Sequence, residues 1–235
     1  AKYIYDSAPR PVPEIAIAAA ISLMAGICGR AYNVSKTGLN QYVLLLGSTG
    51  IGKEAMASGI NRLMSEVKKS VPSAQDFSGP TEFSSGRALT QHLSLISPCF
   101  LSIMGEFGYR LERLNDPRSS VHERDIKRVL LEIYNKSGFT DTYDGTAYTT
   151  KEKNVPQINS PSFSILAETT PDKVYEQLSE EMIIEGLLPR FIIIEYHGDR
   201  VDRNLNHGFE PPGPLVRKLI DLTAHCLQTM NIKRM

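Results

Sequence analysis

The feature that most constrains this chain is a glycine-rich segment between an apolar stretch and a stretch with helical character. Residues 42–46 are continuously apolar, as expected of a strand that is covered on both faces of a sheet. The next segment fits the pattern G-x-x-x-x-G-K of a phosphate-binding loop, in which backbone N–H groups, the following helix start and the lysine surround phosphate oxygens. Its residues are Gly47, Ser48, Thr49, Gly50, Ile51, Gly52 and Lys53. An ordinary glycine-rich turn is less favoured, because a buried strand enters this loop and a helix leaves it.

The position after the lysine departs from the usual pattern. A Ser or Thr there supplies a hydroxyl to Mg²⁺, whereas this chain has Glu54. A second buried strand, residues 99–104, ends in Gly105-Glu106, where related sites carry an Asp that holds Mg²⁺ and often a Glu that polarises water. We therefore expect Glu54 and Glu106 as metal ligands, Glu54 replacing the carboxylate that Gly105 lacks and Glu106 acting as catalytic base. The alternative is that both departures mark a weak or inactive site.

Two downstream segments contain further candidate catalytic residues. Thr169 and Thr170 follow a third buried strand, where a polar side chain can sense the terminal phosphate. A plain helix cap is the alternative for these threonines. Arg190 lies between a helix and a fourth strand, residues 191–196. An arginine delivered to a neighbouring subunit's nucleotide stabilises charge on the transferring phosphate, and a salt bridge that caps the strand is the alternative.

Together these segments resemble a domain family of unknown function from phage, prophage and mobile-element proteins. Its members are P-loop ATPases described as parts of helicases or primase-helicases. The matching segments are residues 40–47 into the loop, 104–108, 143–145 and 186–191. The last of these, Gly-Leu-Leu-Pro-Arg-Phe, also looks like the arginine-finger segment of hexameric helicases such as the minichromosome-maintenance family.

The resemblance covers most of residues 13–200 and carries several expectations. It implies a three-layer α/β P-loop NTPase fold of the RecA-like or AAA+ kind, with a mostly parallel sheet and an inserted β-hairpin. It implies ATP and Mg²⁺ as cofactors. It also implies a homo-oligomeric ring, a hexamer, because Arg190 needs a neighbour's nucleotide to act on.

In ATPases of that class an inserted hairpin often grips DNA. Residues 140–150 alternate around an Asp-Gly pair, which is typical of a two-residue hairpin turn. We therefore expect DNA contact through residues 140–153, by charge and by stacking on bases, and a solvated surface hairpin is the alternative. The basic and aromatic residues concerned are Lys151, Lys153, Tyr143 and Tyr148. Basic residues between 110 and 128 are a second candidate DNA surface, but interleaved acidic residues favour a salt-bridged helical face at least as strongly.

The remaining pattern predicts an α/β domain, because apolar strands alternate with helices. The predicted helices cover residues 13–29, 53–69, 87–96, 124–135, 171–184 and 215–230. Residues 30–35 and 41–46 are predicted strands joined by a turn at 36–40. Residues 1–207 form the predicted core, and residues 208–235 form a Pro/Gly linker and C-terminal helix that belong to the same domain or begin a truncated region.

Composition limits the partners and the cellular compartment that we expect for this domain. Lys plus Arg and Asp plus Glu each total 26, so any DNA contact must come from a local basic patch. The cysteines at 28, 99 and 226 form no metal-binding pattern and are typical of buried residues in a reducing compartment. No apolar run reaches the ~18 residues of a membrane span, so we expect a cytoplasmic protein without membrane contact. The chain begins at Ala1, which favours an excised part of a longer protein.

The leading hypothesis is an ATP-binding and ATP-hydrolysing motor domain of a phage or mobile-element DNA replication protein, of helicase or primase-helicase type. The second is a nucleotide-binding regulatory or scaffold subunit with weak or no hydrolysis, favoured by Glu54 and Gly105. A third, a small-molecule kinase using the same loop, is less favoured because no lid of clustered arginines is evident outside residues 110–128.

Overall fold

The centre of the protein is a parallel β-sheet. The computed structural model describes residues 1–116, 118–145, 154–176, 178 and 183–232. Within them the sheet has four strands in the order β4-β7-β3-β8, and every neighbouring pair is parallel. The strands are β3 (Tyr42–Gly47), β4 (Cys99–Met104), β7 (Ser162–Thr169) and β8 (Phe191–Tyr196). The predicted α/β class with a mostly parallel sheet is therefore confirmed.

Strand β3 is buried along its whole length between two hydrophobic cores. Side chains alternate across a strand, so Val43 and Leu45 enter one core, whereas Leu44 and Leu46 enter the other. A strand that is apolar at every position is stable when both its faces are covered. This requirement places β3 inside the sheet, between β7 and β8.

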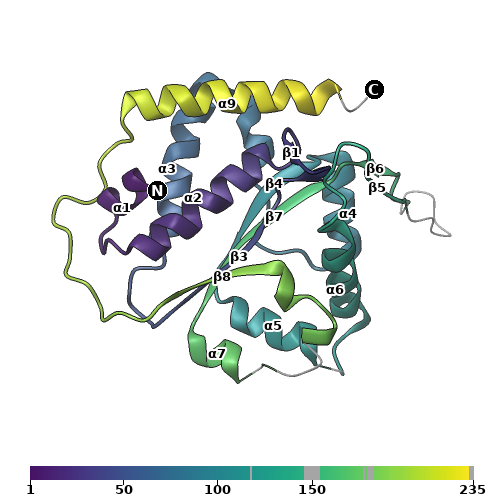
Figure 1. The fold of residues 1–235 in the computed structure, drawn as a ribbon, viewed down its shortest axis with the longest axis horizontal. Helices are drawn as coiled ribbons and strands as arrows, with labels where there is room; N and C mark the ends of the chain where they lie inside the picture. The colour runs from purple at the N-terminus through teal and green to yellow at the C-terminus, as the bar shows by residue number, and fades with distance from the viewer. Residues whose placement is uncertain (117, 146–153, 177, 179–182, 233–235) are drawn as a thin grey trace.

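Helices cover both faces of the sheet, which gives three layers (Figure 1). One core is completed by α1 (Lys2–Ser7), α2 (Pro13–Cys28), α3 (Ala55–Ser70) and α9 (Gly213–Ile232). The other is completed by α4 (Gly86–Leu95), α5 (Phe107–Asn115) and α6 (Val121–Ile133). Leu219 and Cys226 of α9 lie in the same core as α2 and α3, so the terminal helix packs onto the domain.

Two short hairpins differ from the predicted ones. β1 (Asn33–Val34) pairs with β2 (Thr37–Gly38) across Ser35 and Lys36, whose φ angles of 49° and 74° suit a two-residue turn. The turn predicted at residues 36–40 is therefore wrong, because residues 37 and 38 form β2, whereas the strand predicted at 41–46 is confirmed as β3. β5 (Thr142–Tyr143) pairs with β6 (Ile158–Asn159), and the far part of the predicted DNA hairpin, residues 146–153, lies outside the described residues.

Short helices connect several of these elements. η1 (Pro72–Phe77) follows α3, α7 (Pro171–Tyr175) follows β7, and η3 (Leu188–Arg190) leads into β8. In the part of the chain that the structure describes, no helix is both long and apolar enough to cross a membrane.

Candidate functional site

The glycine-rich loop joins the carboxyl end of β3 to α3, at the edge of the sheet where all four described parallel strands end. In open parallel sheets, ligands bind beside this edge. Gly50 and Gly52 have φ angles of 80° and 97°, which glycine adopts without a steric penalty. The Ala55 N–H donates to the Gly52 carbonyl at 3.0 Å, so the helical turn begins inside the loop. The loop therefore lies at the positive end of α3.

Two arginines that the sequence analysis did not single out lie against this loop. A Cβ atom added to Gly52 would lie 3.0 Å from Arg10 Cβ, and one added to Gly50 would lie 3.9 Å from the Arg200 guanidinium. The Arg10 guanidinium donates a hydrogen bond to the Val201 carbonyl, which ties the two segments together beside the loop. Both arginines are far from the loop in sequence, so no local motif indicates them.

Lys53, the lysine of the loop motif, is held by two partners. Its Nζ donates to the Gly47 carbonyl at 3.0 Å and forms an ion pair with Glu168 Oε2 at 2.8 Å. The lysine and glutamate side chains are 12% and 18% exposed, so water screens this pair less than a surface pair. The amine therefore lies within the loop, where a phosphate group would meet it.

Glu168 is the main site residue that the sequence analysis missed. It precedes the two threonines chosen as sensor candidates, and its carboxylate joins three strand ends. Oε2 pairs with Lys53 beside β3, and Oε1 accepts a hydrogen bond of 3.3 Å from the Glu106 N–H beyond β4. An acidic residue at the end of a buried strand was a visible signal, but the neighbours of that strand were not known.

A cavity of about 390 Å³ lies between the loop, the first turn of α3 and the ends of β4 and β7. Glu54, Glu106 and Glu168 all line it, together with Lys53. Among the described residues, no group of three or more His, Cys, Asp or Glu side chains lies close enough together to hold a metal. Mg²⁺ bound with a nucleotide takes one or two carboxylates, phosphate oxygens and water, so this donor set fits that kind of site.

Glu106 has a left-handed backbone conformation, with φ 50° and ψ 39°, between β4 and α5. This conformation is uncommon outside glycine and persists where the surroundings hold it. It turns the Glu106 N–H toward Glu168. The strain therefore lies at the point where the sequence analysis placed the catalytic base.

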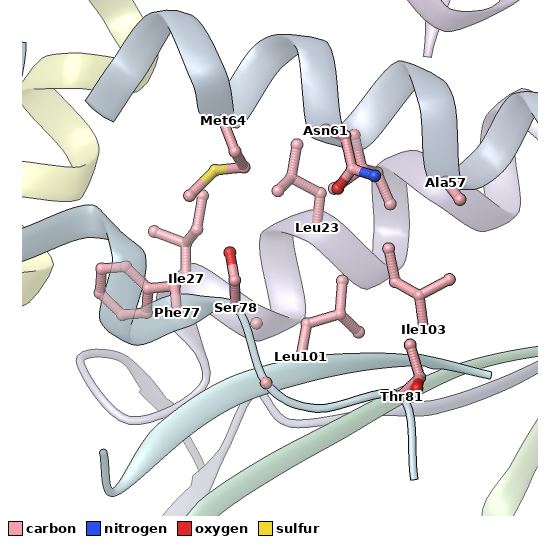
Figure 2. Close-up of a pocket in the computed structure, with 13 residues that line it drawn as sticks. Leu23, Ile27, Ala57, Asn61, Met64, Phe77, Ser78, Thr81, Leu101 and Ile103 are labelled. Carbon is pink, nitrogen blue, oxygen red and sulfur yellow. The ribbon is translucent and has the colours of Figure 1, made fainter. Parts of the chain in front are cut away.

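A second cavity, of about 180 Å³, lies between α2, α3, β4 and the segment after η1 (Figure 2). Leu23, Met64 and Leu101 give it a largely apolar wall. Its polar side chains are Asn61, Ser78 and Thr81. No Lys, Arg, Asp or Glu lines it among the described residues. The larger, charged cavity is therefore the better match for phosphate groups.

The two sensor candidates lie differently from Glu168. Thr169 is 1% exposed, and a Cβ added to Gly108 of α5 would lie 2.6 Å from its Oγ1. Because side chains alternate along β7, Thr169 faces α5, whereas Glu168 faces the loop. Thr170 precedes α7 without a side-chain capping bond. Neither threonine is among the described residues that line the charged cavity.

Arg190 lies at the opposite edge of the sheet from the loop. Phe191 pairs with Tyr42, at the start of β3, whereas the loop follows the end of β3. Arg190 donates to the Gly186 carbonyl at 2.5 Å, and its guanidinium lies 5.9 Å from the ring centre of Tyr134. Its described partner is therefore a carbonyl and not the carboxylate of a salt bridge.

The structure describes only some of the residues in the two candidate DNA surfaces. Tyr143 is 6% exposed, so the expectation that it stacks on bases is wrong. Lys151, Lys153 and Tyr148 lie outside the described residues. The basic residues of 110–128 are largely paired with acidic neighbours, as the salt-bridged alternative predicts. The pairs are Arg110 and Arg113 with Glu82, Arg113 with Glu123, Arg118 with Asp116, Lys127 with Glu185, and Arg128 with Asp125 and Glu132.

Comparison of the chain with protein-family models, curated proteins and solved structures gave no match.

Proposed function

We propose that this chain binds ATP with its phosphates at the glycine-rich loop and hydrolyses it with Mg²⁺, as the motor domain of a DNA replication protein of the helicase or primase-helicase type. The observation that carries the binding step is the position of Lys53, whose amine lies 3.0 Å from the Gly47 carbonyl inside the loop and borders the charged cavity. A lysine held there reaches terminal phosphates as they enter.

Different groups around the cavity have different roles in the proposed binding and hydrolysis. Backbone N–H groups of residues 47–53 and the positive end of α3 attract the phosphates. Lys53 exchanges its Glu168 partner for a phosphate oxygen. Glu106, at the cavity wall beyond β4, is the candidate general base for an attacking water.

Mg²⁺ neutralises the charge that develops on the phosphates when it is bound with them. Glu54 is exposed and borders the cavity, so its carboxylate can reach a cation without moving the loop. The usual hydroxyl ligand at this position is replaced by a carboxylate, which is also a good Mg²⁺ ligand.

The proposal of a ring is supported by the position of Arg190. Strands rise about 3.3 Å per residue, so a guanidinium at the amino end of β8 lies roughly 20 Å from a loop at the carboxyl edge. Arg190 can therefore act on a nucleotide held by a neighbouring copy and not on its own. The proposed assembly is a homo-oligomeric ring, with DNA gripped through residues 140–153.

A nucleotide-binding regulatory subunit is the second candidate. It is favoured by the ion pair of Glu168 with Lys53, because this pair occupies the amine that the phosphates need. Such a subunit would bind ATP tightly and turn it over slowly or not at all.

Calorimetric titration of ATP into the full chain tests the binding step. Lys53→Met should weaken ATP binding by about 10- to 100-fold, because a charged hydrogen bond contributes about 1.5–3 kcal/mol. Lys69→Met is the matched control, since Lys69 lies on the same helix, is 67% exposed and pairs with Glu66. Failure of the wild-type chain to bind ATP, or equal affinity for all three proteins, would refute the proposal.

ATP turnover with and without single-stranded DNA, together with the mass of the assembly in ATP, separates the two candidates. DNA-stimulated turnover by an oligomer is the result expected of the motor. Tight ATP binding without turnover identifies the regulatory subunit instead.

A further inference from the structure

The carboxyl end of β4 lacks the carboxylate that Mg²⁺ sites of this kind place there, and a side chain from the next strand fills the space. A Cβ atom added to Gly105 would lie 3.6 Å from Glu168 Oε1. The carboxylate of an aspartate at position 105 would therefore lie beside the Glu168 carboxylate.

The strand register explains how Glu168 reaches this position. Met104, the last residue of β4, pairs with Ala167 of β7, so the next residues along the two strands are Gly105 and Glu168. The Glu106 N–H donates to Oε1 at 3.3 Å, which holds the carboxylate against the end of β4. The other oxygen, Oε2, is directed at Lys53 in the loop.

Glu54 is less well placed by comparison. It is exposed at the start of α3, and no hydrogen bond or ion pair of its side chain is found among the described residues. Glu168 is 18% exposed and held at both oxygens. Fixing a side chain before binding lowers the entropic cost of using it as a ligand.

We propose that Glu168 supplies, from β7, the Mg²⁺-facing carboxylate that β4 lacks at Gly105. This inference rests on the proposed function. In the nucleotide-free protein Glu168 neutralises Lys53. When ATP and Mg²⁺ bind, Lys53 moves to a phosphate oxygen and the carboxylate faces the cation instead.

This double role predicts that removing the Glu168 charge changes ATP affinity in opposite directions without and with Mg²⁺. Without Mg²⁺, Glu168 competes with the phosphates for Lys53 and repels them, so Glu168→Gln should bind ATP more tightly than wild type. With Mg²⁺, the carboxylate gains a cation to neutralise it, so the same variant should lose most of the benefit that Mg²⁺ confers. Glutamine keeps an acceptor oxygen for the Glu106 N–H, which preserves the local structure.

The test is equilibrium ATP affinity of the full chain, measured in excess EDTA and in excess Mg²⁺. The ratio of the two affinities should fall at least about tenfold in Glu168→Gln, a change of ~1.4 kcal/mol. The ratio in Glu54→Gln should fall less than in Glu168→Gln, because Glu54 borders the cavity but is exposed. The control is Glu66→Gln on the same helix, which pairs with Lys69 and does not line the cavity; its ratio should stay within about twofold of wild type, a change of ~0.4 kcal/mol. The double variant Gly105→Asp/Glu168→Gln should restore the Mg²⁺ dependence, because it returns a carboxylate to this position from β4.

Several outcomes overturn the inference. An unchanged ratio in Glu168→Gln while wild type binds ATP would leave the proposed function intact and remove Glu168 from the metal. Loss of the ratio in Glu54→Gln alone would assign the cation to Glu54. A misfolded variant would not bind ATP more tightly than wild type in EDTA. If Glu168→Gln unfolds at the wild-type temperature and shows no such gain in affinity, the inference is also refuted. Absence of ATP binding by wild type removes the proposed function as well.

Discussion

The two positive-φ glycines of the loop allow a stability test that does not depend on any ligand. Gly52→Ala and Gly50→Ala each place a Cβ atom on a residue whose φ is 97° or 80°. The added atoms meet different surroundings: Arg10 Cβ at 3.0 Å beside Gly52, and only the flexible end of Arg200 at 3.9 Å beside Gly50. The two substitutions therefore share a backbone cost and differ in a packing cost.

The expected magnitudes follow from these contacts. A left-handed conformation costs an L-residue about 1–2 kcal/mol, and the reduced entropy of the unfolded alanine chain offsets about 0.4–1 kcal/mol of it. Gly50→Ala should thus destabilise by about 1 kcal/mol. The Cβ atom added to Gly52 must in addition displace Arg10, so about 2–3 kcal/mol is expected.

Thermal unfolding followed by circular dichroism measures the difference. At roughly 3 °C per kcal/mol for a chain of this size, Tm should fall by about 3 °C in Gly50→Ala and about 6–9 °C in Gly52→Ala. Gly213→Ala is the control, because no heavy atom lies within 4 Å of the added Cβ. Equal Tm values for the two loop variants would refute the Arg10 contact. Values equal to that of the control would refute the positive φ angles.

Two further predictions concern the sensor and arginine-finger candidates. Among the described residues no hydrogen-bond partner reaches the buried Thr169 Oγ1. Thr169→Val should therefore leave the free energy of unfolding unchanged or raise it by up to about 1 kcal/mol, which is measured as an equal or higher unfolding temperature. It should also leave ATP turnover unchanged, and a loss of turnover at wild-type stability would instead assign Thr169 a sensor role. Arg190→Ala and Lys53→Met should each abolish turnover alone but regain part of it when mixed, because an intact loop then meets an intact arginine from a neighbour. An inactive mixture beside an active wild type would contradict action across subunits.

The local features of this fold were predictable from the sequence. The apolar run before the loop, the glycines inside it and the helix after it are neighbours along the chain, and the structure has β3, two positive-φ glycines and α3 there. The same holds for β4 and β7, whose apolar runs are largely buried. β8 was also predicted as a strand, but it lies at the edge of the sheet and leaves Ile192 and Ile193 40% and 45% exposed. Whether the loop binds a nucleotide stays a prediction.

Features that depend on strand order were not predictable in the same way. The turn predicted at residues 36–40 was wrong, because residues 33–34 pair with residues 37–38, whereas the apolar strand after them pairs with β7 and β8 inside the sheet. The sequence indicated Thr169 and Thr170 as site residues and not Glu168. Glu168 and Thr169 are neighbours in β7, and one residue decides which face a side chain takes. Arg10 and Arg200 approach the loop only through tertiary packing.

The order β4-β7-β3-β8 explains why the end of β7 suits a carboxylate that serves two partners. Neighbouring strands lie about 4.8 Å apart, so a side chain at the end of one strand contacts the ends of its immediate neighbours and no others. Of the four described strands, β7 alone has both the loop strand β3 and the Glu106 strand β4 as neighbours. Glu168, at the end of β7, contacts Lys53 and the Glu106 N–H together. When Lys53 leaves Glu168 for a phosphate, the Glu168 carboxylate loses its neutralising partner, and the Glu106 N–H then faces an unpaired negative charge. A carboxylate supplied from β7 therefore links occupancy of the loop to the backbone at the start of α5.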